Sequence, residues 1–264
     1  MINFTTGQRI NVVKTLVANF ALLPFKQAIH LPILIHGSCK LGTIKGKVIL
    51  NGKISRGMVN IGSSDFVRSY GSKTYIAIMG VLELEEGVII RKGMKLRISP
   101  SAKITLKKNS FIGDNCSFVS DCSITIGENT RIEQGSFLMD TDYHYIVNLS
   151  DRTIKDNLAP IVIGDNNWFG MYTIVKKRTI TPNGTIVLGP FSSIGKDYTK
   201  TIPEYSMIGG SPAKLVREGY RRIYNLKSEE YLLNYFKNHE SDYRLDDSTD
   251  IDAFCAPAIH QKQL

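Results

Sequence analysis

A six-residue spacing of large apolar residues runs through the middle of the chain and restricts the folds open to it. The series comprises Leu84, Ile90, Leu96, Leu106, Ile112, Phe118, Ile126, Ile132, Leu138, Ile163, Phe169 and Val175. A helix would place such residues three and four apart, and a half-buried strand two apart. A spacing of six instead indicates very short strands joined by turns, each strand sending one side chain inward.

A short phrase, Ile-Gly-acidic-Asn, marks the turns between these strands. It occurs at residues 112–115, 126–129 and 163–166. Glycine suits a turn that needs a positive φ or a close backbone approach. Asp and Asn suit turns because their side chains bond the local backbone and tolerate the left-handed region. Such periodicity is a sequence sign of a parallel β-helix, in which each coil covers the apolar face of its neighbour.

Two further stretches carry a family resemblance. Residues 163–170 read IGDNNWFG, and residues 209–214 read GGSPAK. With the repeated phrase, they resemble the hexapeptide-repeat acyltransferases, and most of all the galactoside, maltose and polysaccharide O-acetyltransferases. The resemblance covers about residues 80–217. It implies a left-handed parallel β-helix, a homotrimer whose active sites lie between subunits, and acetyl-CoA as the acyl donor.

The chain divides into three parts on this interpretation. We expect a basic N-terminal cap segment over residues 1–44, with a helical stretch ended by Pro24, and the β-helix over residues 45–205. Residues 139–160 are polar and are predicted to form a loop extruded from one coil. Residues 206–264 are predicted to form a helical extension, with a helix starting at Ser228, and an acidic tail.

The N-terminal segment has an unusual charge. The first sixty residues hold eight Lys and Arg and no Asp or Glu, out of a net charge of +9 for the chain. A basic amphipathic segment of this kind either caps the open end of the β-helix or lies on an anionic membrane surface. No nucleic-acid-binding motif accompanies the charge. No secretory signal and no apolar run of roughly 18 residues is visible, so we expect a cytoplasmic protein, with contact with the inner face of the cell membrane as the alternative.

The candidate catalytic base is His144. It is the one histidine of the repeat region, among five in the chain, and lies in the expected loop near Asp140 and Asp142. A sugar hydroxyl is a poor nucleophile until a base removes its proton, and a histidine can serve as that base. The resemblance places the catalytic histidine of these enzymes in this loop. Asp140 or Asp142 would orient its ring, whereas an exposed loop histidine is the simpler alternative.

The resemblance implies further site residues. Asn115, Asp121 and Trp168 would bind the acceptor, although Asn115 could equally be a turn residue. The set expected to bind coenzyme A comprises Trp168, Gly170, Ser192, Lys196, Lys214 and Arg217. Basic residues at 176–178 add positive charge nearby. A solvated basic surface is the alternative for these cations.

The predicted function is acetyl-CoA-dependent O-acetylation of a sugar hydroxyl in a bacterial surface polysaccharide or its precursor. The alternatives are N-acetylation of an amino-sugar nucleotide and a non-catalytic structural β-helix. The resemblance implies direct transfer without a covalent enzyme intermediate. The four cysteines include no CxxC pair and are interpreted as packed, reduced thiols. One histidine in the repeat region cannot supply the three zinc ligands of a γ-type carbonic anhydrase, so no metal is expected.

Overall fold

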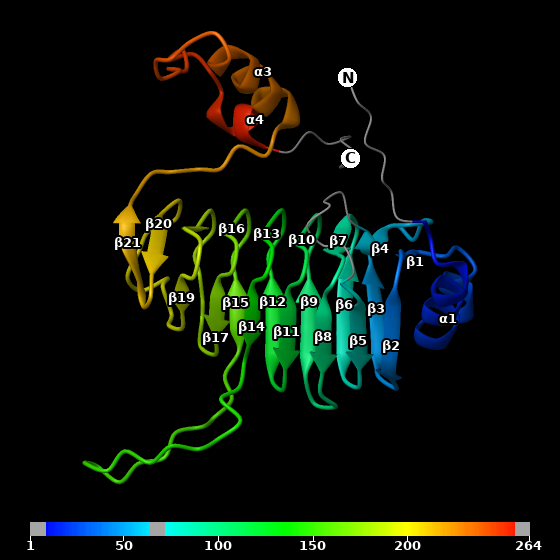
Figure 1. Cartoon of the computed structure of the whole chain (residues 1–264). Helices are drawn as coiled ribbons and strands as arrows, with labels where there is room; N and C mark the ends of the chain where they lie inside the picture. The colour runs from blue at the N-terminus through cyan, green and yellow to red at the C-terminus, as the bar shows by residue number, and fades with distance from the viewer. Residues whose placement is uncertain (1–8, 64–71, 257–264) are drawn as a thin grey trace.

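The computed structural model describes residues 9–63 and 72–256, and its body is a parallel β-helix (Figure 1). Successive coils stack along one axis, and each regular coil contributes one strand to each of three sheets. The fold class predicted from the six-residue spacing is confirmed. Helices cover the N-terminal end, and a separate helical unit follows the last strand.

The strands of each sheet are evenly interleaved in the sequence. The first sheet contains β1 (Ile33–Ile35), β4 (Val59–Ser63), β7 (Val88–Arg91), β10 (Phe111–Ile112), β13 (Arg131–Ile132), β16 (Trp168–Phe169), β18 (Ile186–Val187), β20 (Met207–Gly210) and β21 (Ala213–Arg217). The second contains β2 (Cys39–Ile44), β5 (Thr74–Ile78), β8 (Lys95–Ile98), β11 (Ser117–Ser120), β14 (Phe137–Met139), β17 (Ile174–Lys176) and β19 (Ser193–Ile194). The third contains β3 (Lys47–Asn51), β6 (Val81–Glu85), β9 (Lys103–Leu106), β12 (Ser123–Ile126) and β15 (Ile161–Ile163).

The six-residue series lines the axis of the β-helix. Within one coil, Leu106, Ile112 and Phe118 come from the third, first and second sheets and are each 0% exposed. In the next coil, Ile126, Ile132 and Leu138 stand in register with them. Each position of the series therefore stacks on its counterpart one coil away, which buries nearly all of its apolar surface.

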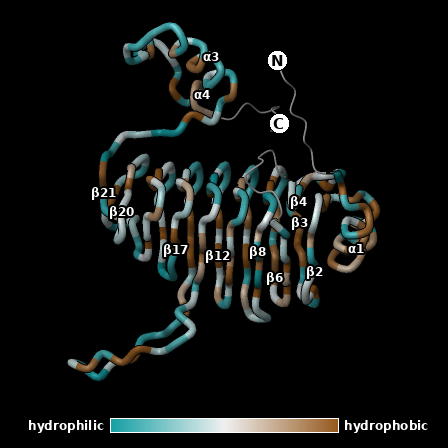
Figure 2. The backbone as a smooth tube through the Cα atoms, viewed as in Figure 1, coloured by the Kyte–Doolittle hydropathy of each residue, from teal (hydrophilic) through white to brown (hydrophobic). Residues whose placement is uncertain are grey.

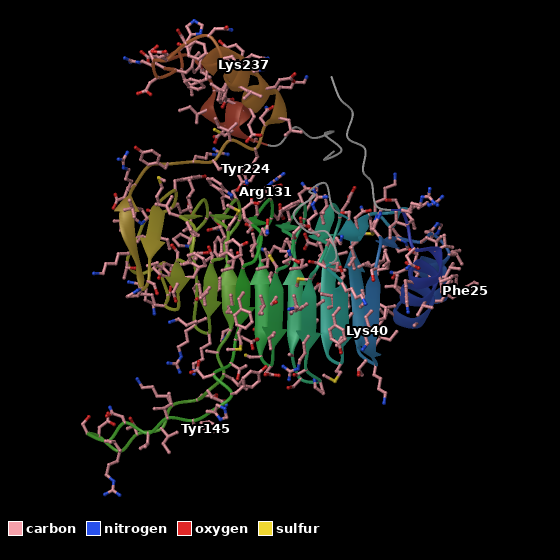
Figure 3. All side chains as sticks on the ribbon, viewed as in Figure 1. Phe25, Lys40, Arg131, Tyr145, Tyr224 and Lys237 are labelled. Carbon is pink, nitrogen blue, oxygen red and sulfur yellow. The ribbon has the colours of Figure 1, made fainter. Side chains whose placement is uncertain are left out.

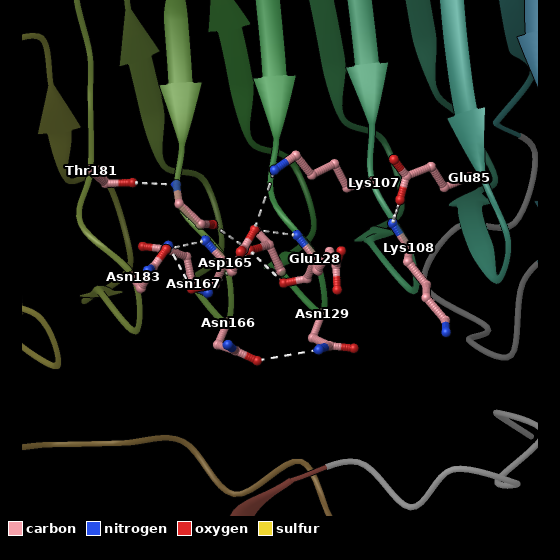
Figure 4. A network of polar contacts seen from close by, with 12 residues as sticks. Glu85, Lys107, Lys108, Glu128, Asn129, Asp165, Asn166, Asn167, Thr181 and Asn183 are labelled. Carbon is pink, nitrogen blue, oxygen red and sulfur yellow. Dashed lines mark hydrogen bonds and ion pairs between the residues drawn. The ribbon is translucent and has the colours of Figure 1, made fainter. Parts of the chain in front are cut away.

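In the Ile-Gly-acidic-Asn phrase, the glycine and the asparagine make different contributions to the turn. A Cβ on Gly127 would lie 2.3 Å from the carbonyl oxygen of Gly164, so glycine is needed for close stacking. The left-handed conformation falls on the asparagines instead, with φ of 52° at Asn129 and 56° at Asn166. Figure 4 shows these two side chains joined at one corner, with Asn129 Nδ2 donating to Asn166 Oδ1 at 3.3 Å. The corner is thus held by side chains as well as by backbone.

Both ends of the sheets lie outside the predicted limits of 45 and 205. The stack starts at β1 and continues through β20 to β21, which turns back antiparallel to β20. Strands β1, β20 and β21 lack the repeated phrase. The sequence gives little sign of them for that reason.

Helices occupy the two termini of the described chain. Helices α1 (Val12–Leu22) and α2 (Phe25–Ala28) cover the N-terminal end of the β-helix. Helices α3 (Leu226–Phe236) and α4 (Ile251–Cys255) form the C-terminal unit. Helix α3 starts two residues before the predicted Ser228, because the side chain of Asn225 caps it by accepting from Lys227 N. The acidic segment docks back through Cys255, whose carbonyl accepts from Tyr224 N at 2.7 Å.

The described cysteines are free thiols. Cys116 is fully buried in the core, and burial raises the pKa of its thiol to about 12. Burial likewise raises the pKa of Cys39 to about 11. Thiols of this kind are unreactive at neutral pH, which agrees with packed, reduced cysteines. None of the helices that the structure describes has the length and apolar content of a membrane span.

Candidate active site

The predicted loop is a long hairpin that leaves the β-helix at the corner between the second and third sheets. The chain departs after β14 and returns at β15, and the two arms run antiparallel, with bridges pairing Thr141 with Leu158 and Val147 with Ile154. Figure 3 shows Tyr145 well clear of the body of the molecule. His144 lies on the outgoing arm and is exposed. Its side chain is therefore accessible to solvent within one chain.

Asp140 is buried at the base of the hairpin and is fully used by hydrogen bonds. Its carboxylate accepts from Ser120 Oγ at 2.7 Å, Asp121 N at 2.8 Å and Cys122 N at 3.0 Å. Buried carboxylates need such donors, because an unpaired charge away from water is costly. Asp140 therefore fastens the hairpin to the preceding coil, and within one chain it does not touch His144.

Lys177 ties the two arms together near the same base. Its ammonium group lies 2.7 Å from Asp142 Oδ2 on the outgoing arm and donates to the carbonyl of Asp156 on the returning arm at 2.8 Å. The Lys177 side chain is 13% exposed, so solvent screens this pair less than an open surface pair. Asp142 is thereby directed to Lys177 and not to His144. The structure places both predicted orienting carboxylates in the support of the hairpin.

A second brace starts from Asp121, one of the predicted acceptor-binding residues. Its carboxylate accepts from Arg97 Nη2 at 3.0 Å and from Ser99 Oγ. Arg97 then donates to the hydroxyl of Tyr143 at 3.0 Å, directly before His144. Tyr143 has a φ of 60°, an uncommon conformation for a bulky residue that is often found at functional positions. This chain of contacts fixes the backbone that presents His144.

Lys196 lies at the same corner as the hairpin, two coils further along. Lys176 lies on the intervening coil, at the end of β17, and its side chain reaches the next coil. A Cβ on Gly195 would lie 3.0 Å from Lys176 Cε. Lys196 Nζ lies 5.0 Å from the centre of the Tyr198 ring. Within residues 9–63 and 72–256, neither ammonium group pairs with a carboxylate. These two lysines therefore offer free positive charge beside the hairpin.

Two other predicted coenzyme-binding residues have a packing role in the structure. Gly170 must lack a side chain, because a Cβ there would lie 2.4 Å from Gly189 N. Ser192 is buried; its hydroxyl donates to the carbonyl of Leu188 and accepts from Gly210 N at 3.0 Å. Both residues hold adjacent coils together at the corner between the first and second sheets. Lys214 and Arg217 lie exposed on β21 at the end of the first sheet.

Trp168 and Asn115 lie away from the hairpin within one chain. Trp168 is on the outer side of the first sheet, where its Nε1 donates to Glu133 Oε1 at 3.1 Å and the Arg222 guanidinium lies 4.7 Å from the centre of its ring. Asn115 occupies a left-handed turn at the corner between the first and second sheets, with φ of 58°. A Cβ on Gly93 would lie 2.0 Å from its Oδ1, so its side chain lies over that glycine.

The sequence analysis missed several residues that support the hairpin. Arg97, Ser99, Ser120 and Tyr143 are contributed by three coils, and the contacts among them span tens of positions in the chain. No local pattern marks such pairs. Asp140 did carry a signal, because it lies two residues after the inward-facing Leu138 and so has the same inward direction along the strand.

Fold and sequence together define a class: the chain is a hexapeptide-repeat β-helix protein whose homologues are acetyltransferases, and the predicted resemblance is confirmed. It is 29% identical over 136 residues to the Escherichia coli protein named as a colanic acid biosynthesis acetyltransferase, WcaF, covering 52% of this chain and 69% of that protein. It is 29% identical over 153 residues to the Escherichia coli protein named as a lipopolysaccharide biosynthesis O-acetyl transferase, WbbJ, covering 54% and 75%.

A further relative and a solved structure match at lower identity. The Escherichia coli galactoside O-acetyltransferase is 28% identical over 144 residues, covering 54% of this chain and 63% of that protein. Among solved structures, the polysialic acid O-acetyltransferase OatWY matches with a TM-score of 0.46 and 16% identity, over 83% of this chain and 100% of that one. No family model matches the chain.

Proposed function

We propose that this protein is an acetyl-CoA-dependent O-acetyltransferase that acts on a sugar hydroxyl of a bacterial surface polysaccharide or its precursor. The observation that carries this proposal is His144, exposed on a hairpin whose base is braced by Asp140, Lys177 and Arg97. A structural β-helix has no need for a histidine on a hairpin that is braced in this way. The similarity to WcaF and WbbJ supports a glycan acceptor.

His144 is proposed to remove the proton from the acceptor hydroxyl as that oxygen attacks an acyl carbonyl. A histidine is suited to this because its imidazole changes protonation near neutral pH. Acetyl-CoA supplies the acyl group as a thioester. Asn115 or backbone N–H groups would hold the negative charge that develops on the carbonyl oxygen.

The cations near the hairpin fit a polyanionic donor. Lys196 and Lys176 offer ammonium groups at the hairpin corner, and the Lys214 ammonium and the Arg217 guanidinium add positive charge at the end of the first sheet. Phosphate groups are bound through charges of this kind. Ser192 and Gly170 would act indirectly, by holding the backbone on which a donor could rest.

The assembly proposed is a homotrimer. Within one chain, His144 lies at the corner between the second and third sheets, whereas Trp168 lies on the first sheet and Asn115 at a different corner. A neighbouring copy is needed to bring these groups to one acceptor. A closed ring of identical chains is the ordinary way to supply such a neighbour. We place the protein in the cytoplasm, with the basic N-terminal segment against the inner face of the cell membrane.

A panel of acceptors with acetyl-CoA tests the proposal, with release of free thiol as the measurement. The expected result is thiol release that depends on a sugar hydroxyl and disappears in His144→Ala. Amine acceptors in the same panel distinguish N-acetylation. Calorimetric titration with coenzyme A provides the complement: no heat of binding, together with no thiol release, would favour a purely structural β-helix.

A further inference from the structure

Helix α1 covers the end of the β-helix with its more polar side. The buried residues of the helix are Thr15, Ala18, Asn19 and Leu22, which recur at helical spacing on one face. Two of the four are polar. An amphipathic helix on a protein surface ordinarily buries its apolar side and exposes its polar side. The packing of α1 is the reverse of that pattern over much of its length.

The two buried polar residues satisfy the backbone of strand β1. Asn19 Nδ2 donates to Ile33 O at 2.7 Å, and Asn19 Oδ1 accepts from Ile33 N at 3.1 Å. Thr15 Oγ1 accepts from Ile35 N at 3.0 Å. Strand β1 is the first strand of its sheet and has a neighbour, β4, on one side only. An uncovered edge strand invites pairing with other chains, and α1 prevents this by side-chain hydrogen bonds.

The opposite side of α1 is therefore left apolar and open to solvent. We call it, together with the adjoining part of α2, the outer cap face. It consists of Val12, Val13, Leu16, Val17, Phe20, Phe25 and Ile29. Val13 is 67% exposed and Phe25 72% exposed. The rings of Phe20 and Phe25 lie 6.1 Å apart, so the two helices present one continuous patch.

This patch is unusual for its place in the fold. The end of a solenoid needs a cap with a polar outer surface to stay soluble. Figure 3 shows Phe25 at the outermost end of the molecule, and Figure 2 shows hydrophobic residues along α1. A large apolar patch on an otherwise polar surface marks an interaction site.

The positive charge around the outer cap face favours a partner with an anionic surface. The first sixty residues contain eight basic and no acidic residues. Lys14 lies on α1, and the exposed Lys26 is adjacent to Phe25. A second copy docked face to face would place these like charges against each other. The complementary partner has an anionic surface over an apolar interior, and a bilayer of acidic phospholipid has both.

We propose that the outer cap face binds the surface of an anionic phospholipid bilayer. Phe20, Phe25 and the valines of α1 would enter the boundary between headgroups and acyl chains, with Lys14 and Lys26 at the level of the phosphates. The inference deepens the membrane contact included in the proposed function and rests on it. The β-helix would then stand with its N-terminal end on the membrane and the hairpin at its side. That placement suits an acceptor glycan that is itself anchored in the membrane.

Vesicle flotation with the full chain tests the proposal. We expect the protein to float with vesicles of phosphatidylcholine and phosphatidylglycerol, and to bind those of phosphatidylcholine alone far more weakly. Phe20→Ser with Phe25→Ser should weaken binding to the anionic vesicles by about tenfold or more, since two large apolar side chains no longer enter the lipid. Lys14→Gln and Lys26→Gln should each weaken it by roughly fivefold.

The matched control is Leu233→Ser with Phe236→Ser, which removes two exposed apolar residues from α3 and should leave flotation unchanged. Val13→Ser with Val17→Ser tests the same face while Phe20 and Phe25 stay in place. All cap variants should keep the wild-type melting temperature and the wild-type rate on a soluble acceptor.

The proposal is overturned if the wild-type protein does not float with anionic vesicles, or if the cap variants float as well as the wild type. Self-association in the absence of lipid that Phe20→Ser with Phe25→Ser abolishes also overturns it, because a second copy would then be the occupant. If the wild-type protein floats with anionic vesicles but transfers no acetyl group, the result counts against the proposed acetyltransferase activity and not against membrane binding.

Discussion

The β-helix interior and the hairpin that projects from it are stabilised in opposite ways. Each coil buries one large apolar side chain from each sheet, as Leu106, Ile112 and Phe118 show. Beyond its base, the hairpin exposes its apolar residues, with Leu149 86% and Ile146 74% exposed. Its order comes from polar contacts at the base. Stability and activity should therefore respond to different substitutions.

The largest effect is expected at the hairpin. His144→Ala should lower kcat by roughly 100- to 10,000-fold, the usual contribution of a general base. The free energy of unfolding should change by less than about 0.5 kcal/mol, because the residue is exposed. Steady-state kinetics and thermal melting on the same samples measure both quantities, with His239→Ala, at an exposed residue beyond the end of α3, as the control. A near-wild-type kcat would rule out His144 as the base.

A substitution in the interior of the β-helix should lower the stability of the protein strongly. Phe118→Ala should destabilise the protein by about 3–5 kcal/mol, because it leaves a cavity in a stacked core. Chemical denaturation measures this free energy. Phe111→Ala is the matched control: Phe111 is on the outer side of the same coil, between the guanidinium groups of Arg91 and Arg131, and its loss should cost clearly less. Equal costs would contradict the assignment of inner and outer sides.

Asp140 joins the two regions, so its replacement should affect both. Asp140→Ala leaves Asp121 N and Cys122 N without their acceptor and should cost about 1–3 kcal/mol of stability. It should also lower kcat, because the hairpin loses an attachment. Asp142→Ala, at a half-exposed side chain, should change stability by less than about 1 kcal/mol. If the two variants are equally stable, the base of the hairpin is not held as the structure indicates.

The smallest effect is expected from the cations at the hairpin corner. Lys196→Glu should raise KM for acetyl-CoA several-fold with little change in KM for the acceptor, because the charge would hold phosphates far from the reacting carbon. Lys214→Glu should act in the same direction. Lys237→Glu, at the C-terminal cap of α3, makes the same charge change elsewhere and should have no effect. If KM for the acceptor changes instead, acetyl-CoA must bind at another surface.

Much of the fold could be read from the sequence, because each coil repeats one local rule. The six-residue spacing identified the inward residues, and the repeated phrase identified the turns. The helical extension predicted from residue 206 begins later, since residues 220–225 are not helical and the Tyr224 hydroxyl donates to the carbonyls of Asn166 and Asn167. Contacts with a distant coil outweighed the local pattern there.

The candidate site was less predictable, because its supports come from several coils. Proximity in sequence suggested Asp140 and Asp142 as partners of His144, whereas the structure uses them to hold the hairpin. The apolar spacing of α1 was visible, but spacing alone cannot say which side of a helix faces the protein. That choice was made by Thr15 and Asn19, through hydrogen bonds to a strand that the sequence barely marks.

The base of the hairpin has a consequence for how such proteins diversify. The two arms meet where Ala159 N donates to the carbonyl of Asp140 at 3.1 Å, directly above the coil. Because the coil closes at that point, the length and composition of the segment beyond it are decoupled from the stacking beneath. Hairpins of other lengths could be exchanged on the same scaffold, so new acceptor preferences can arise without rebuilding the architecture.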